Sequence, residues 1–170
     1  KEIMEEDAIG KPLISGSDLD IPEEVLARIP KFVAHVPNVD HRYGNGTARV
    51  AGMGVYGKEG GIVSSVAQGD RICIRISVEF QEDVSQPNVG FMLRNRLGQD
   101  VTGTNVMFEG MRLPPAVAGE RLSVDFVMDL PFLHAGFYYF SPAVADGTLD
   151  QYQMCDWIDN AYAIEVIQRT

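Results

Sequence analysis

Arg94, Arg96 and Asn105 have side chains whose types and spacing suit the recognition of a ligand. They lie in the stretch 84–108, where apolar residues alternate with glycine and polar residues, as in a strand with one face in a core. A glycine-containing turn at 97–100 then sends the chain back as a second strand. The two strands would hold the three side chains on one outward face, where guanidinium and amide groups can donate hydrogen bonds.

Four consecutive aromatic residues, at 137–140, form a second candidate feature. A strand alternates its two faces, so two of these rings must point away from the core. We expect Tyr138 and Phe140 inside, and Phe137 and Tyr139 outside.

Tyr139 would then lie close to Met92 and Arg94, because the two strands are often neighbours in a sandwich. A ring flanked by hydrogen-bond donors suits the C–H face and the hydroxyls of a pyranose. The alternative is that the N-terminal segment or a second subunit covers the outer rings. Trp157, which precedes the last predicted strand, is either a wedge that closes one end of the sandwich or a stacking ring at the rim of the site.

Other chemistries have weaker support, and we predict no metal, no cofactor and no catalytic residue. The histidines do not cluster with metal-ligand spacing, and no phosphate-binding G-x-x-x-x-G-K-[ST] run occurs. Four acidic residues gather near one loop, and calcium would be the metal that suits them, but turn residues and solvated charges are the favoured explanation: Asp146, Asp150, Asp156 and Asp159. Asp146 and Asp156 could also form a glycosidase-like carboxylate pair, whereas Ser141 lacks a nucleophile-elbow context.

The composition limits the classes of partner. The chain has 14 Lys and Arg against 24 Asp and Glu, a net charge of −10, which argues against nucleic acid or anionic lipid as the ligand. No apolar run reaches the roughly 18–20 residues of a membrane-spanning helix, and no signal peptide opens the sequence. Two cysteines are too few for a disulfide scaffold, so Cys73 is expected to be a buried thiol. Because the sequence begins with Lys1, we expect a fragment of a longer protein.

The pattern predicts an all-β domain behind an N-terminal tether. Residues 1–40 are rich in proline, contain the acidic cluster Glu5-Glu6-Asp7, and would form one short helix around 23–29, capped at Asp20 or Ile21. Residues 41–170 would form about eight strands, arranged as an immunoglobulin-like antiparallel β-sandwich. The predicted strands are 47–56 and 62–66, joined as a hairpin, then 70–80, 89–96, 101–106, 120–130, 135–145 and 161–168. The alternation in 70–80 places Cys73 on the outer face, so burial of its thiol would require a covering partner.

Five motifs in register resemble the C-terminal domain of Wzt, the ATP-binding component of the ABC transporter that exports bacterial O-antigen polysaccharide. They are HRYGNGTARV (41–50), FQEDV (80–84), VGFMLR (89–94), GTN (103–105) and DW (156–157). Two positions depart from the resemblance: Cys155 stands where many relatives have histidine, and Thr47 stands where an acidic residue is expected.

The resemblance implies a β-sandwich that binds the exported glycan, usually through a cap on its non-reducing end. It also implies a cytoplasmic homodimer held at the inner membrane by the transporter, with an upstream ATPase domain and a membrane subunit as partners. Exchange of the final strand between subunits is a further implication. A dimerisation module without glycan contact is the alternative function.

Overall fold

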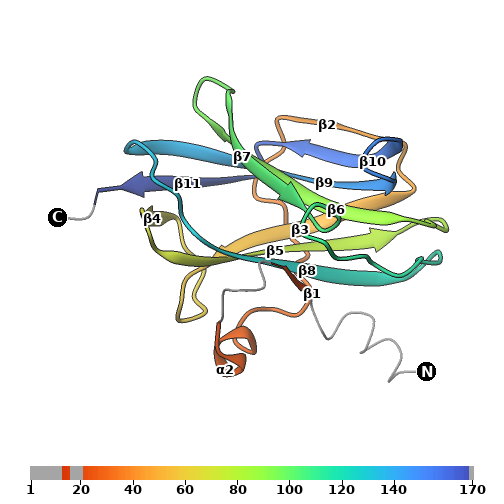
Figure 1. Ribbon diagram of the computed structural model, residues 1–170, viewed down its shortest axis with the longest axis horizontal. Coiled ribbons are helices and arrows are strands. Elements are labelled where there is room, and N and C mark those ends of the chain that lie inside the picture. Colours follow the sequence, from red (N-terminus) through yellow and green to blue (C-terminus); the bar gives the residue numbers. More distant parts are fainter. Residues whose placement is uncertain (1–12, 16–20, 169–170) are drawn as a thin grey trace.

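The chain folds into two β-sheets packed face to face, as Figure 1 shows for the computed structural model, which describes residues 13–15 and 21–168. The first sheet has four strands, in the order β1 (Leu13–Ser15), β8 (Arg121–Asp129), β5 (Arg71–Phe80) and β3 (Ala48–Tyr56). The second sheet has seven strands: β2 (His41–Tyr43), β4 (Ser65–Ala67), β6 (Pro87–Asn95), β7 (Asp100–Asn105), β9 (Gly136–Gly147), β10 (Tyr152–Asp159) and β11 (Tyr162–Ile167).

Strand β9 organises the second sheet. On one side it pairs with β6, and β7 pairs with the far edge of β6. On the other side it pairs with β10 and then with β11, which are extended by β2 and β4 respectively. These pairings are antiparallel except β4 with β11, and β1 also joins β8 in parallel. The predicted all-β sandwich is confirmed.

The core between the sheets follows the period-two patterns of the sequence. The inward residues of β5 are nearly inaccessible, from Ile72 to Phe80, and Val89 and Leu93 of β6 are fully buried. Phe91 packs edge-on against Phe126 of the opposite sheet, with 5.3 Å between ring centroids. The predicted inward positions of the strand at 70–80 and of the strand at 89–96 are therefore confirmed.

A segment N-terminal to the sandwich covers the outer face of the first sheet. Helix α2 (Glu23–Leu26) lies beneath this sheet in Figure 1. Val25 and Ile29 are buried there and form a second apolar cluster with Cys73 and Val127. This explains how Cys73 can point outward and still be buried: the covering partner is the segment 21–36 of the same chain. The predicted helix and its docking are confirmed, while the domain boundary at residue 40 stays a prediction.

Polar contacts fix the same segment to the sheet. The amide of Val33 donates to the hydroxyl of Ser77 at 2.8 Å, and the hydroxyl of Ser123 donates to the carbonyl of Lys31 at 2.7 Å. Arg75, which forms a buried ion pair with Asp125 at 2.6 Å, also donates to the carbonyls of Ile29 and Pro30. The acidic cluster at Glu5–Asp7 and the helix cap expected at Asp20 lie outside the described residues.

Two strand predictions need correction. The hairpin predicted for 47–56 and 62–66 forms only at its base, where Tyr56 bridges Ile62 in antiparallel fashion; β4 then pairs in parallel with β11 of the other sheet. The residues before the last strand, for which no strand was predicted, form the eight-residue strand β10, with Trp157 inside it. The short strand β2 was also not predicted, because three residues are too few to show a period.

Candidate functional site

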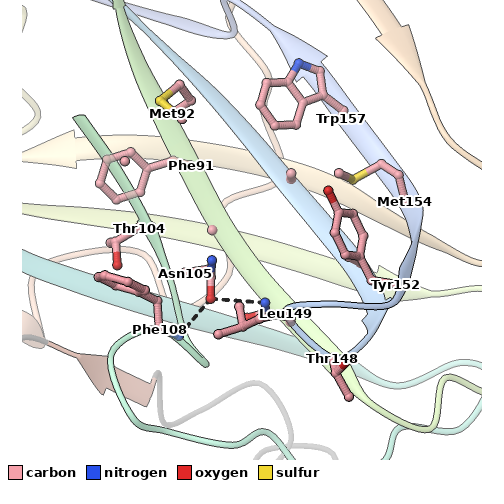
Figure 2. Close-up of a pocket in the computed structure, with 15 residues that line it drawn as sticks. Phe91, Met92, Thr104, Asn105, Phe108, Thr148, Leu149, Tyr152, Met154 and Trp157 are labelled. Atoms are coloured by element: carbon pink, nitrogen blue, oxygen red, sulfur yellow. Dashed lines mark hydrogen bonds between the residues drawn. The ribbon is translucent and has the colours of Figure 1, made fainter. Parts of the chain in front are cut away.

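A hollow of about 380 Å³ lies on the outer face of the second sheet, over β7, β6, β9 and β10 (Figure 2). We call it the outer-sheet hollow. Its floor is made by the outward residues of the central strands, and its walls are made by side chains from β10 and from the segments after β7 and β9. The residues that line it are Asn88, Gly90, Phe91, Met92, Gly103, Thr104, Asn105, Phe108, Ala143, Ala145, Thr148, Leu149, Tyr152, Met154 and Trp157.

Small residues keep the floor low. Gly90 of β6 stands opposite Ala143 of β9, and Ala145 follows two residues later on the same face. A Cβ atom on Gly90 would come within 2.4 Å of the carbonyl oxygen of Thr104, so any larger residue would force β6 and β7 apart. The close approach of these two strands therefore requires glycine at position 90.

A β-bulge in β10 brings two side chains of its wall to the same side. Met154 pairs with Ala145 and Trp157 pairs with Ala143, with a register shift between them. Three residues apart in a regular strand, they would point to opposite faces; the extra residue, Cys155, corrects the phase. Both therefore line the hollow in Figure 2.

Exposed rings stand on opposite sides of the floor. Phe108 follows β7 and is 70% exposed, while Tyr152 begins β10 and is 56% exposed. Figure 2 shows the two rings rising on either side of the floor, with Trp157 farther along β10. Exposed aromatic side chains gathered around a cavity are characteristic of binding surfaces rather than of packing.

Asn105 presents a fixed donor to the hollow. Its Oδ1 accepts hydrogen bonds from the backbone amide of Phe108 at 2.8 Å and from Nδ2 of Asn88 at 3.1 Å. A backbone amide can only donate, so this contact settles which end of the Asn105 side chain is oxygen. Its Nδ2 has no hydrogen-bond partner among the residues that the structure describes, and in Figure 2 it points away from these contacts, over the floor.

Arg94 lies beside the hollow but is held by acidic side chains. Its Nε donates to Asp100 at 2.8 Å and its Nη1 donates to Asp159 at 3.0 Å. The hydrogen bond that Arg94 donates to the Asp100 carboxylate raises the pKa of Arg94. The guanidinium also lies 5.3 Å from the ring centroid of Trp157, whose Nε1 donates to the same Asp159 carboxylate. Arg94 thus orients the Trp157 ring, and its charge is neutralised.

The predicted site residues divide into two groups. Met92, Asn105 and Trp157 line the outer-sheet hollow. The remainder lie outside it: Arg94, Phe137 and Tyr139 on the same sheet, and Arg96 in the turn after β6. Tyr139 is the cross-strand neighbour of Arg94, as expected, and Tyr138 and Phe140 are buried while Phe137 is exposed.

The residues considered for catalysis have structural contacts. Asp156 is buried and accepts hydrogen bonds from Arg42 and from the backbone amide of Val50, which ties β10 to β2 and to β3 of the opposite sheet. Asp156 raises the pKa of Arg42 through this pair. Ser141 is buried and accepts from the amide of Asn160. Within the described parts of the chain, no group of three or more His, Cys, Asp or Glu residues is placed to hold a metal ion.

Most of the residues that form the walls of the hollow were not predicted from the sequence. Phe108 and Tyr152 were not proposed as site residues, although both are aromatic residues beside predicted turns. Met154 could not be predicted from the alternation of residues, because the bulge at Cys155 breaks the alternation that would relate it to Trp157.

None of the helices in the described residues has the length and apolar character needed to span a membrane.

Comparison with known proteins agrees with the architecture. The model of the Wzt C-terminal domain family matches residues 39–170. The crystal structure of the C-terminal domain of Wzt superposes with a TM-score of 0.72 at 18% identity, covering 81% of this chain and 83% of that one. A Niemann-Pick type C2 protein from the Japanese carpenter ant superposes with a TM-score of 0.53 at 8% identity, covering 78% of this chain and 100% of that one.

The structural matches, at such low identity, establish the fold alone. Among curated protein sequences, none matches this chain. The family model, however, covers most of the sequence and includes all five motifs that carry the resemblance. The chain therefore belongs to the Wzt C-terminal domain family.

Proposed function

We propose that this chain is a non-catalytic carbohydrate-recognition domain that binds O-antigen polysaccharide, at its modified non-reducing end, and so selects it for export by an ABC transporter. The observation that carries the proposal is the outer-sheet hollow, where exposed rings surround a low floor and an amide donor, the Nδ2 of Asn105, that has no partner among the described residues. Rings of this kind can contact the C–H faces of a sugar, while amide and hydroxyl groups bond its hydroxyls.

The hollow is shallow, so the affinity of one domain should be modest. We expect a Kd on the order of 10 μM to 1 mM, or roughly −4 to −7 kcal/mol. Family membership supports a role in a transporter. We propose that the domain acts as a homodimer on the cytoplasmic side of the inner membrane, linked to an ATPase domain and a membrane subunit. Two linked hollows would strengthen binding through avidity.

The sequence provides an internal reporter for this proposal. Trp157 is the only tryptophan of the chain and it lines the hollow, so its fluorescence responds to events at this site. Titration with surface polysaccharide purified from the bacterium that encodes the chain is expected to change this fluorescence with saturation.

Two wall variants should weaken that binding. Phe108→Ala and Tyr152→Ala are each expected to raise Kd about five- to tenfold, because each removes one ring contact worth about 1 kcal/mol. Both side chains are more than half exposed, so the fold should tolerate their loss. Phe132→Ala is the matched control, since Phe132 is 77% exposed and lies outside the hollow. Equal binding by all three variants and the parent would refute the site.

The predicted contacts beyond the hollow are tested in the same titration. Arg94→Ala and Tyr139→Ala should also weaken binding if the glycan extends along the sheet from the hollow. If only these two variants lose affinity, the glycan occupies the surface around Tyr139 and not the hollow.

A second candidate function is subunit assembly, and one observation favours it. Phe137 and Ile167 are 49% and 44% exposed on β9 and β11, and both lie outside the hollow. Sedimentation of the Phe137→Asp variant tests this function. Loss of a dimer, together with no glycan binding by the parent protein, would favour assembly over recognition.

A further inference from the structure

We propose that the outer-sheet hollow accepts an uncharged sugar unit and disfavours units that carry phosphate, sulfate or carboxylate groups. This inference rests on the glycan recognition proposed above, and it names the class of sugar. Four features of the site support it: the neutrality of the lining, the apolar floor, the engagement of the neighbouring arginine and the acidity of the rim.

The lining carries no charge at neutral pH. Of the described residues that line the hollow, none is Asp, Glu, Lys, Arg or His. An anionic group placed there would lose part of its hydration without meeting a cation, which is unfavourable. The identified donors, such as the amide Nδ2 of Asn105, are neutral and suit hydroxyl, ether or carbonyl oxygens.

The floor adds a preference for apolar surface. Met92 and Met154 place thioether side chains beside Ala143 and Ala145, and Gly90 adds no side chain to the lining. Such a floor suits the C–H face of a pyranose or a methyl-sized substituent on it. Polar contacts come from the edges of the hollow.

The nearest arginine is not available to an anion. Arg94 is shared between the carboxylates of Asp100 and Asp159, so this group of three has a net charge of −2 + 1 = −1. Arg96, two residues farther along, is exposed in the turn between β6 and β7 and does not line the hollow.

Carboxylates also stand at other parts of the rim. Glu109 is hydrogen-bonded to the hydroxyl of Thr104, which itself lines the hollow. Asp146 and Asp150 lie beside Tyr152 at the opposite end. An approaching anionic sugar therefore meets negative charge on several sides, and such charges repel it over a range of roughly 8 Å at physiological salt.

The first experiment measures salt dependence. Trp157 fluorescence is titrated with surface polysaccharide purified from the encoding bacterium, at about 50 mM and about 500 mM NaCl. A neutral sugar unit predicts that Kd changes by less than about threefold, because no ionic contact is screened. A change of threefold or more would overturn the inference while leaving glycan recognition intact.

The second experiment adds a charge to the wall. Leu149 is 51% exposed in the segment between β9 and β10, so Leu149→Lys and Leu149→Gln should both fold. For a neutral ligand, the two variants should bind with Kd values within about threefold of each other, because their side chains differ mainly in charge. Tighter binding by the lysine variant beyond that limit, abolished at high salt, would show an anionic ligand and overturn the inference. No fluorescence response from any protein would instead refute the proposed function itself.

Discussion

At the scale of single residues, two ion pairs on the same two strands differ sharply in burial. Arg75 and Asp125 join β5 to β8 in the interior, with side-chain exposures of 2% and 1%. Arg71 and Asp129 join the same strands four residues away, with exposures of 36% and 47%. The fold thus offers a matched comparison of a buried and an exposed ion pair.

Asp125→Asn is expected to lower the free energy of unfolding by about 3–5 kcal/mol, because it leaves the buried guanidinium of Arg75 without its counter-charge. Asp129→Asn should unfold close to the parent protein, because water screens the exposed pair. Urea denaturation of the two variants measures both effects. Similar midpoints for the two would show that burial of Arg75 does not control the strength of the pair.

Residue positions could be predicted from the sequence where the two-residue repeat of a strand determines which face a side chain occupies. Arg94 was expected beside Tyr139, and the two residues are paired across β6 and β9. The ion pairs of Arg94 with Asp100 and Asp159 could not be predicted, because Asp159 lies 65 residues away in the sequence.

The two positions that depart from the Wzt pattern lie together in the structure. The hydroxyl of Thr47 is 3.1 Å from the sulfur of Cys155.

At the scale of elements, the segment 21–36 acts as a cover for the first sheet. Burial raises the pKa of the Cys73 thiol, which keeps it protonated and unreactive while the cover is closed. Ile29 is one of the buried side chains that hold the cover in place.

Ile29→Ala should therefore loosen the cover and expose Cys73. We expect its reaction with an aromatic disulfide reagent to accelerate at least about tenfold, since losing such a contact costs about 2–5 kcal/mol in local stability. Cys155, buried elsewhere, is the internal control, and peptide mass spectrometry separates the two rates. Equal acceleration of both thiols would indicate global unfolding in place of local opening.

Elements with regular alternation were predictable, and those that break it were not. Strands β5, β6 and β8 keep one inward face along their length, so their sequences show it. Strand β10 contains a bulge, and β4 has three residues paired in parallel with the last strand. Neither a bulge nor a distant parallel partner leaves a period in the local sequence.

At the scale of the whole molecule, the two buried thiols should lower the free energy of unfolding as the pH becomes alkaline. Burial raises the pKa of both Cys73 and Cys155 in the folded state. In the unfolded chain their pKa is about 8.5. Above that pH the unfolded state loses these protons and the folded state retains them, so stability falls as pH rises.

We expect the free energy of unfolding to decrease between about pH 8 and about pH 9.5, by up to about 1.4 kcal/mol per thiol and pH unit above the unfolded pKa. The Cys73→Ala/Cys155→Ala variant, although less stable at neutral pH, should lose less over this range. Denaturation at both pH values under reducing conditions measures the two slopes. Identical slopes would mean that the thiols do not contribute.

The architecture of the whole molecule could be predicted more fully than its surface. Strand count, turn spacing and the shared motifs indicated a sandwich, and the family match agrees with it. Which outer face stays open could not be predicted, since the segment 21–36 covers the first sheet through contacts distant in sequence. The second sheet keeps an uncovered region, and the hollow lies there.

The bulge at Cys155 sets which residue of β9 lies opposite Trp157. Deleting residue 155 alone would give a regular strand in which Trp157 stands two residues after Met154 and still lies opposite Ala143. Adding one residue there would place Trp157 four residues after Met154, so in a regular strand it would keep its face but move opposite Ser141, about 7 Å farther along β9. The deletion should therefore preserve the position of Trp157 in the hollow, whereas the insertion should displace it.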